Sequence, residues 1–139
     1  MTSFEHLLQP IKIGGLQLAN RLLMTPMGTE LGTHDGHSTP AEAAYYAERA
    51  KGGTGLVMTG INFVSGVFDP IAPGLARIDT DAHTPGIRAI AEAVHEAGGV
   101  LALQLTMGLG RNKPVLPDPE HGAAVVVGQH LVFRPERAL

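Results

Sequence analysis

The chain has 139 residues, a formal net charge of -3 at pH 7 and 44% hydrophobic residues. This size and composition predict one globular domain. The charges are spread along the sequence without a basic block or an acidic tail, so no nucleic-acid partner is expected. The chain has no cysteine, which excludes disulfides, thiolate metal ligands, iron–sulfur ligation and a cysteine nucleophile within these residues.

Polar residues interrupt the N-terminal region, which argues against a signal peptide: Glu5, His6 and Gln9 break any apolar run. No stretch of the sequence approaches the length of a membrane span. We therefore expect a cytoplasmic protein that acts on a small molecule and does not bind a membrane.

The first predicted structure is a β-hairpin. Two short extended segments, 11–13 and 16–18, are separated by Gly14-Gly15, a dipeptide typical of hairpin turns. Apolar and polar residues alternate in both segments. We expect the hairpin to cover one end of the strands that follow it.

A short apolar strand, Leu22 to Thr25, leads directly into Pro26, Met27 and Gly28. Pro26 fixes its own φ and favours an extended Thr25. Gly28 leaves the main chain without a side chain over it. This strand end suits a flat ligand that lies against backbone.

The first helix has a clear predicted start. Thr39 is the expected N-cap, Pro40 stands at the first helical position, and Glu42 completes a capping box. The helix is predicted to end near Lys51, before Gly52-Gly53. Two tyrosines in this helix, Tyr45 and Tyr46, are expected to anchor it on the sheet.

Two more strands and a second helix follow. The segments 55–60 and 100–105 read as buried parallel strands. Between them lie a long loop, 61–80, and a helix. Thr84 is its predicted N-cap, with Pro85 at the first helical position, and Gly98-Gly99 is predicted to end it.

The alternation is therefore βαβαβ with parallel strands and right-handed crossovers. In the tail, 106–139, no helix is predicted, and 123–127 is a candidate for a further short strand outside the alternation. No G-x-G-x-x-G follows any strand, which disfavours a doubly wound dinucleotide fold.

Four pieces of the sequence follow one another in a recognisable order: Pro10 to Gly14, Asn20-Arg21 followed by Met24 to Thr29, Tyr46 to Ala50 leading to Gly55 to Gly60, and Gln104 to Thr106 with Gly110-Arg111. Together they resemble the N-terminal part of the old yellow enzymes, which are FMN-dependent NAD(P)H:flavin oxidoreductases. The branch that includes 2,4-dienoyl-CoA reductase and the clostridial-type enoate and bile-acid-inducible reductases is the most similar.

This resemblance implies an α/β TIM (β/α)8 barrel, with FMN at the C-terminal mouth. The chain would be the N-terminal portion of that single domain, supplying the hairpin and about the first three βα units. The polar or glycine residues at the predicted strand ends agree with this placement. A complete barrel takes roughly 250 residues, so we expect this chain not to close a barrel alone.

The family resemblance also assigns roles to individual residues. Thr25, Pro26, Met27 and Gly28 would lie against the flavin ring, Gly60 would approach its edge, and Gln104 would hydrogen-bond its pyrimidine side. Arg111 would contact substrate or pair with carboxylates.

Other polar residues have different expected roles. Asn20 and Arg21 precede the strand, at the bottom of the barrel, where a stabilising role is expected. The histidines have no metal-ligand spacing. Only His34 and His37, in the first βα loop, lie where they are worth testing.

The implied activity uses NAD(P)H to reduce the C=C bond of an α,β-unsaturated carbonyl or enoyl substrate. An iron–sulfur cluster and FAD would be involved only if a longer chain follows. Three alternatives remain: a split fragment that acts by assembling with the remaining strands or as a homo-oligomer, a flavin-free TIM-barrel enzyme, and a non-catalytic binder.

Overall fold

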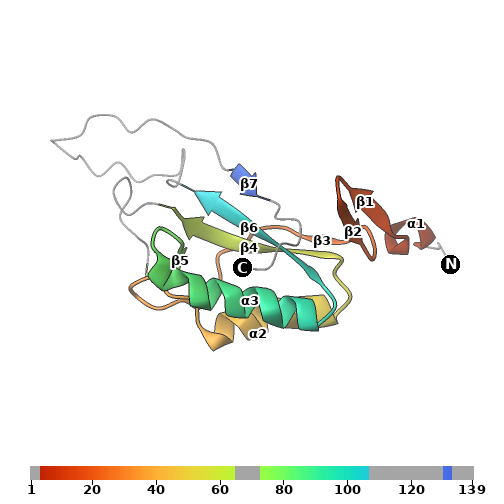
Figure 1. The fold of residues 1–139 in the computed structure, drawn as a ribbon. Helices are drawn as coiled ribbons and strands as arrows, with labels where there is room; N and C mark the ends of the chain where they lie inside the picture. Colours follow the sequence, from red (N-terminus) through yellow and green to blue (C-terminus); the bar gives the residue numbers. More distant parts are fainter. Residues whose placement is uncertain (1–3, 65–72, 107–129, 133–139) are drawn as a thin grey trace.

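The computed structural model describes residues 4–64, 73–106 and 130–132. A five-stranded, mostly parallel sheet carries two helices on one side, and a separate hairpin lies at one end (Figure 1). The elements, in chain order, are α1 (Glu5–Leu8), β1 (Ile11–Ile13), β2 (Leu16–Leu18), β3 (Leu23–Met24), α2 (Pro40–Lys51), β4 (Leu56–Phe63), β5 (Ala76–Arg77), the 3-10 helix η1 (Asp81–His83), α3 (Thr84–Glu96), β6 (Val100–Thr106) and β7 (His130–Val132).

The predicted hairpin is confirmed. Strands β1 and β2 are antiparallel, with Ile11 opposite Leu18, and Gly14 takes the positive φ (+58°) that the turn requires. Leu18 is buried against Leu56 and Ala102. The arrowheads of β4 and β6 point away from the hairpin (Figure 1), so it covers the N-terminal ends of these strands.

Helix α2 has the predicted bounds, but only half of the predicted capping box forms. The Thr39 hydroxyl accepts a hydrogen bond from the Glu42 N–H at 3.3 Å. The Glu42 carboxylate does not return to Thr39; it accepts from the Thr29 hydroxyl at 3.1 Å instead. The prediction of a full capping box was wrong because a nearby loop residue reaches this carboxylate.

Helix α3 ends as predicted, with Gly98 at φ +79°, but the predicted cap was wrong. Thr84 is the first helical residue, and His83 stands at the N-cap position without a side-chain cap bond. Because η1 runs directly into α3, Thr84 already has helical dihedrals (φ -55°, ψ -43°). It therefore has no role as a cap.

The parallel β3-β4-β6 order confirms the βαβαβ alternation. Strand β4 extends to Phe63, so Gly60 lies inside the strand and the prediction that the strand ends there was wrong. Two short strands were not predicted: β5 pairs with β4 in parallel, and β7 pairs with β6 antiparallel. The predicted strand at 123–127 lies outside the described residues.

The sheet has a different core on each face. On the helix side, Val57 packs with Tyr46, Ile90 and Val94, and Leu101 lies against this cluster. On the other face, the residues next to the hairpin form a second cluster: Leu18, Leu56, Met58 and Ala102. Figure 1 shows α2 and α3 side by side under the first of these faces.

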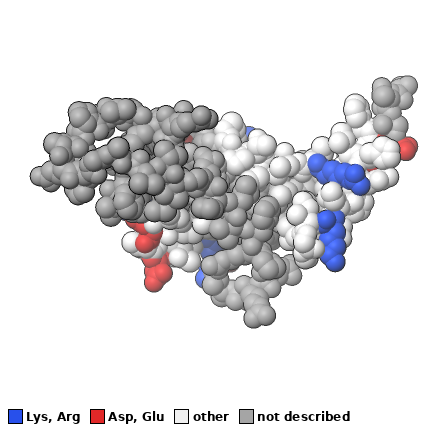
Figure 2. Space-filling model, turned by 90° about the horizontal axis from the view of Figure 1, so that it is seen from above, with Lys and Arg blue, Asp and Glu red and all other residues white. Residues whose placement is uncertain are grey.

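Charged side chains on the described surface do not gather into one extended patch in the view of Figure 2, where blue and red groups are separated by white surface. Within the described part of the chain, no helix combines the length and the apolar character needed to cross a membrane.

Candidate functional site

A β-bulge in β4 organises the candidate site. Met58 pairs with Ala102, but Ile61, three residues further on, pairs with Gln104 only two residues further on. Thr59 and Gly60 therefore both lie opposite Leu103, which is the two-against-one arrangement of a bulge. Because side chains alternate along a strand, the extra residue reverses the alternation beyond it. As a result, Ile61 and not Gly60 pairs with Gln104.

Gly60 lies directly against the segment that follows β3. A Cβ built on Gly60 would be 2.5 Å from the Met27 carbonyl oxygen and 3.0 Å from the Gly28 Cα. Only a residue without a side chain permits this approach. The structure thus brings together Met27 and Gly28, which the sequence placed just after one strand, and Gly60, which it placed at the end of another.

Both polar backbone groups of Gly60 are already bound within the protein. Its N–H donates to the Tyr46 hydroxyl at 2.8 Å. Its carbonyl accepts from the Thr59 hydroxyl at 3.0 Å and from Asn62 Nδ2 at 2.9 Å. Any ligand contact at Gly60 would therefore be a van der Waals contact.

Tyr46 anchors α2 on the sheet, as predicted. Its side chain is fully buried and its hydroxyl accepts the Gly60 N–H. Burial raises the pKa of Tyr46 to about 12, because the phenolate would be poorly solvated there. The phenol is therefore neutral at physiological pH and serves as a hydrogen-bonding anchor.

Gln104 lies on the sheet face opposite the helices. Ala102, two residues earlier, packs on the hairpin side, and Leu101 packs on the helix side. Gln104 is 9% exposed, and its N–H donates to the Thr59 hydroxyl at 3.3 Å. It therefore lies above the hairpin-side cluster, further toward the C-terminal end of β6.

The remaining predicted flavin residues form an accessible segment. Thr25, Met27 and Gly28 are exposed and Pro26 is half-buried. Met27 keeps 54% of its surface accessible. Arg111, the predicted substrate contact, lies outside the described residues.

The two loop histidines differ. His34 is exposed, whereas the His37 ring lies 4.5 Å from the ring of His83. The buried His83 Nδ1 is 3.2 Å from Asp79 Oδ1, and Arg77 pairs with the same carboxylate. Hydrogen bonding from Arg77 lowers the pKa of Asp79. His37 therefore joins a polar cluster between the first and second βα loops.

Glu42 is a buried carboxyl group that sequence patterns did not single out beyond its capping role. Its side chain is 5% exposed and accepts from the Thr29 hydroxyl. Burial raises the pKa of Glu42 above its usual value, because a carboxylate loses hydration there.

Asn20 has the structural role expected of it. Its Oδ1 accepts from the N–H groups of Leu22 at 3.0 Å and Gly55 at 3.1 Å, and its Nδ2 donates to Gly53 at 2.7 Å. These bonds tie the starts of β3 and β4 together. Arg21 contributes a backbone bond, from its N–H to the Leu7 carbonyl.

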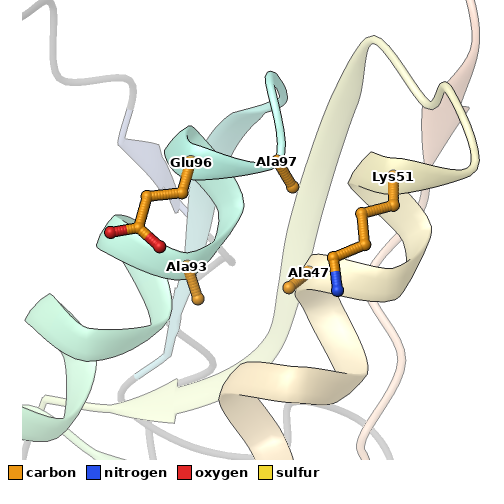
Figure 3. A pocket seen from close by; sticks show the side chains of 5 residues that line it. All are labelled: Ala47, Lys51, Ala93, Glu96 and Ala97. Atoms are coloured by element: carbon orange, nitrogen blue, oxygen red, sulfur yellow. The ribbon is translucent and has the colours of Figure 1, made fainter.

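An open hollow of about 560 Å³ lies between α2 and α3, away from the candidate site. Figure 3 shows Lys51 and Glu96 on either side of Ala47, Ala93 and Ala97. All of its lining residues come from the two helices or the end of α3, and none is a predicted flavin residue. Among the described residues, no cluster of three or more metal-ligating side chains occurs.

Sequence reasoning missed Thr59, Ile61 and Asn62, which the bulge brings into the site. A glycine inside an apolar strand is a known signal of a bulge or a close backbone approach. Gly60 carried that signal, but the pattern also fits a strand that ends there.

Comparison with known proteins identifies the family. The NADH:flavin oxidoreductase / NADH oxidase family profile matches residues 6–130. The chain is 36% identical to the NADH:fumarate oxidoreductase of Klebsiella pneumoniae over 90% of its length, and 37% identical to the cinnamate reductase of Clostridium sporogenes over 78%. It spans only 15% and 17% of those two proteins.

Solved structures support the same relationship. The old yellow enzyme from Pichia sp. AKU4542 superposes with a TM-score of 0.70 and 33% identity, over 76% of this chain and 27% of that one. Morphinone reductase matches over 75% of this chain with a TM-score of 0.65. The described strands thus correspond to part of a TIM barrel. The chain belongs to the NADH:flavin oxidoreductase / NADH oxidase family.

Proposed function

We propose that the protein is an FMN-dependent oxidoreductase that uses NAD(P)H to reduce the C=C bond of α,β-unsaturated carbonyl or enoyl substrates. This chain would contribute one part of the flavin site. Three relatives support the substrate class by their names: an NADH:fumarate oxidoreductase, a cinnamate reductase and an NADH:acrylate oxidoreductase. Fumarate, cinnamate and acrylate each carry an alkene conjugated to a carboxyl group.

The observation that carries this proposal is the contact between Gly60 and the Met27-Gly28 backbone, with Gln104 on the neighbouring strand. A flat ring needs main chain without projecting side chains, and Gly28 carries none of its own, with Leu75 Cδ2 3.3 Å from the position that a Cβ would take. An amide such as that of Gln104 can both donate to and accept from a ring edge.

The predicted flavin residues would have different roles in binding FMN. Thr25, Pro26, Met27 and Gly28 would form the surface under the ring, Gly60 would limit it at one edge, and Gln104 would orient it. Bound FMN would supply the hydride transfer between NAD(P)H and the alkene. This chain's own contribution would be orientation of the flavin. Arg111 remains a proposed substrate contact.

We also expect a cytoplasmic location, and assembly with further barrel strands or as a homo-oligomer. An iron–sulfur cluster and FAD are expected only if a longer chain follows.

Amine oxidation is the competing reaction. It is suggested by a relative named N,N-dimethylglycine/sarcosine dehydrogenase, which is 35% identical over 75% of this chain.

The test uses the full-length protein as its gene encodes it. We expect a flavin absorption spectrum, and NADH or NADPH oxidation that depends on added cinnamate, acrylate or fumarate. Sarcosine is the competing substrate. A colourless protein would favour a flavin-free barrel, and flavin reduction by sarcosine alone would replace alkene reduction with amine oxidation.

A further inference from the structure

The Asn62 side chain in β4 is buried, and its amide nitrogen donates to three acceptors. It is 1% exposed. Its Nδ2 lies 2.7 Å from the Thr59 hydroxyl, 2.9 Å from the Gly60 carbonyl and 3.3 Å from the Gln104 carbonyl. An amide group has two N–H hydrogens, so three acceptors occupy both of them.

Two of these acceptors belong to the bulge in β4, and the third belongs to the neighbouring strand β6. Thr59 and Gly60 are the two β4 residues that lie opposite Leu103, and Gln104 is the next residue on β6. The Thr59 hydroxyl completes the arrangement, since it donates to the Gly60 carbonyl and accepts from the Gln104 N–H. Backbone groups at a bulge lose regular ladder partners, and here the Asn62 and Thr59 side chains replace them.

The bulge decides which β4 residue lies beside Gln104. If the pairing of Met58 with Ala102 continued without a bulge, Gly60 would pair with Gln104. The observed pairing is Ile61 with Gln104. A shift of one residue also exchanges the two faces of a strand, so the same change would move Gly60 away from Met27-Gly28.

We propose that Asn62 is a positioning residue of the flavin site. Its amide holds the bulge, which keeps Ile61 beside Gln104 and Gly60 against the Met27-Gly28 backbone. Asn62 acts through these neighbours and need not touch the cofactor. This inference rests on the proposed function, because its importance for activity depends on FMN lying at these residues.

The experiment compares Asn62→Asp with Asn20→Asp in the full-length protein. Each substitution replaces an amide by a carboxylate of similar shape and removes an Nδ2 donor to a backbone carbonyl. Asn20 lies at the opposite end of β4, where its Nδ2 donates to Gly53. It therefore controls for the loss of an amide donor at a half-buried position, and Asn62→Ser, which adds no charge, controls for the carboxylate that Asn62→Asp would bury.

Two measurements separate positioning from stability. Amide hydrogen exchange at Gly60 and Gln104 reports the bulge directly, with or without FMN. For Asn62→Asp we expect protection there to fall about tenfold more than at Val57 in the strand core, because tenfold corresponds to about 1.4 kcal/mol, within the range found for one hydrogen bond. We also expect the Kd for FMN to rise about tenfold and the visible circular dichroism of the flavin to change.

Asn20→Asp should lower the free energy of unfolding. It should leave unchanged both the flavin spectrum and the protection at Gly60 and Gln104 relative to that at Val57. If Asn62→Asp does not fold, Asn62→Ser, which retains one hydroxyl donor, should give a smaller change in the same direction. Unchanged exchange at Gly60 and Gln104, or equal effects of both Asp variants on the flavin, would overturn the inference. A wild-type protein without FMN would instead overturn the proposed function, and the exchange data would still test whether Asn62 holds the bulge.

Discussion

Gly60 is the residue at which three segments of the chain meet. Its Cα faces the Met27-Gly28 backbone, its N–H binds Tyr46, and its carbonyl binds Thr59 and Asn62. The single hydrogen in place of a side chain allows the first contact. The close approach therefore depends on glycine at this position.

Substitution of Gly60 by alanine should destabilise the protein. The added Cβ would lie 2.5 Å from the Met27 carbonyl oxygen, so backbone must move. We expect the free energy of unfolding to fall by about 1–3 kcal/mol in urea titrations. Gly15→Ala is the control, because a Cβ there meets nothing within 4 Å, and its effect should stay within about 0.5 kcal/mol. Equal effects of the two variants would contradict the contact.

The raised pKa of Glu42 predicts that the stability of the protein depends on pH. Burial raises its pKa in the folded state, so the folded chain binds this proton more tightly than the unfolded chain does. The stability contributed by the protonated form is complete below the ordinary pKa of 4.5 and is lost as pH rises through the folded value.

Glu42→Gln should therefore gain stability relative to wild type as pH rises from about 4 to 8. The measurement is urea unfolding across that range. Glu48→Gln is the control, because hydrogen bonding from exposed Lys51 lowers the pKa of Glu48 and gives the opposite sign. A difference between wild type and Glu42→Gln that does not vary with pH would refute the assignment.

Among the helices and strands, local sequence signals predicted those whose formation depends on interactions between residues close together in the chain. The Gly14-Gly15 turn fixed the hairpin, and Thr39 with Pro40 fixed the start of α2. The bulge depends on Asn62 reaching across to β6, and β5 and β7 form by pairing with distant strands. Because no periodicity within a segment records such contacts, the sequence did not predict them.

The two threonine-proline pairs test the same distinction. Thr39 caps α2 and also donates to the Leu31 carbonyl at 2.7 Å, whereas Thr84 is already helical. Thr39→Ala should lower the free energy of unfolding by about 1–2 kcal/mol. Thr84→Ala should change it by less than about 0.5 kcal/mol. Thermal unfolding of both variants checks this, and a larger loss at Thr84 would restore it as the cap.

At the scale of the whole molecule, the described residues form one part of a barrel wall. One face carries two helices, and the hairpin covers the N-terminal ends of the strands (Figure 1). Apolar residues remain exposed in β3 and in the segment after it, including Leu23 at 50% and Met27 at 54%. The flavin residues predicted from the sequence lie on this wall near the carboxyl ends of the strands. Their neighbours on the other side of a barrel mouth would come from strands beyond these three.

A 139-residue polypeptide of this sequence alone should therefore not hold FMN in stoichiometric amounts. It supplies three parallel barrel strands of the eight that enclose such a site. Gel filtration with absorbance at flavin wavelengths provides the measurement. A purified polypeptide that elutes with one FMN per chain and oxidises NADH would contradict this expectation.

If this chain provides part of an FMN site, Gln104→Leu in the full-length protein should weaken the binding of FMN. Loss of an orienting amide should raise the Kd for FMN by about fivefold to 150-fold, as expected for a hydrogen bond worth about 1–3 kcal/mol. Gln17→Leu, on the exposed side of the hairpin, should leave the Kd unchanged. An unchanged Kd for Gln104→Leu, or equal losses in both variants, would contradict a flavin site at Gln104.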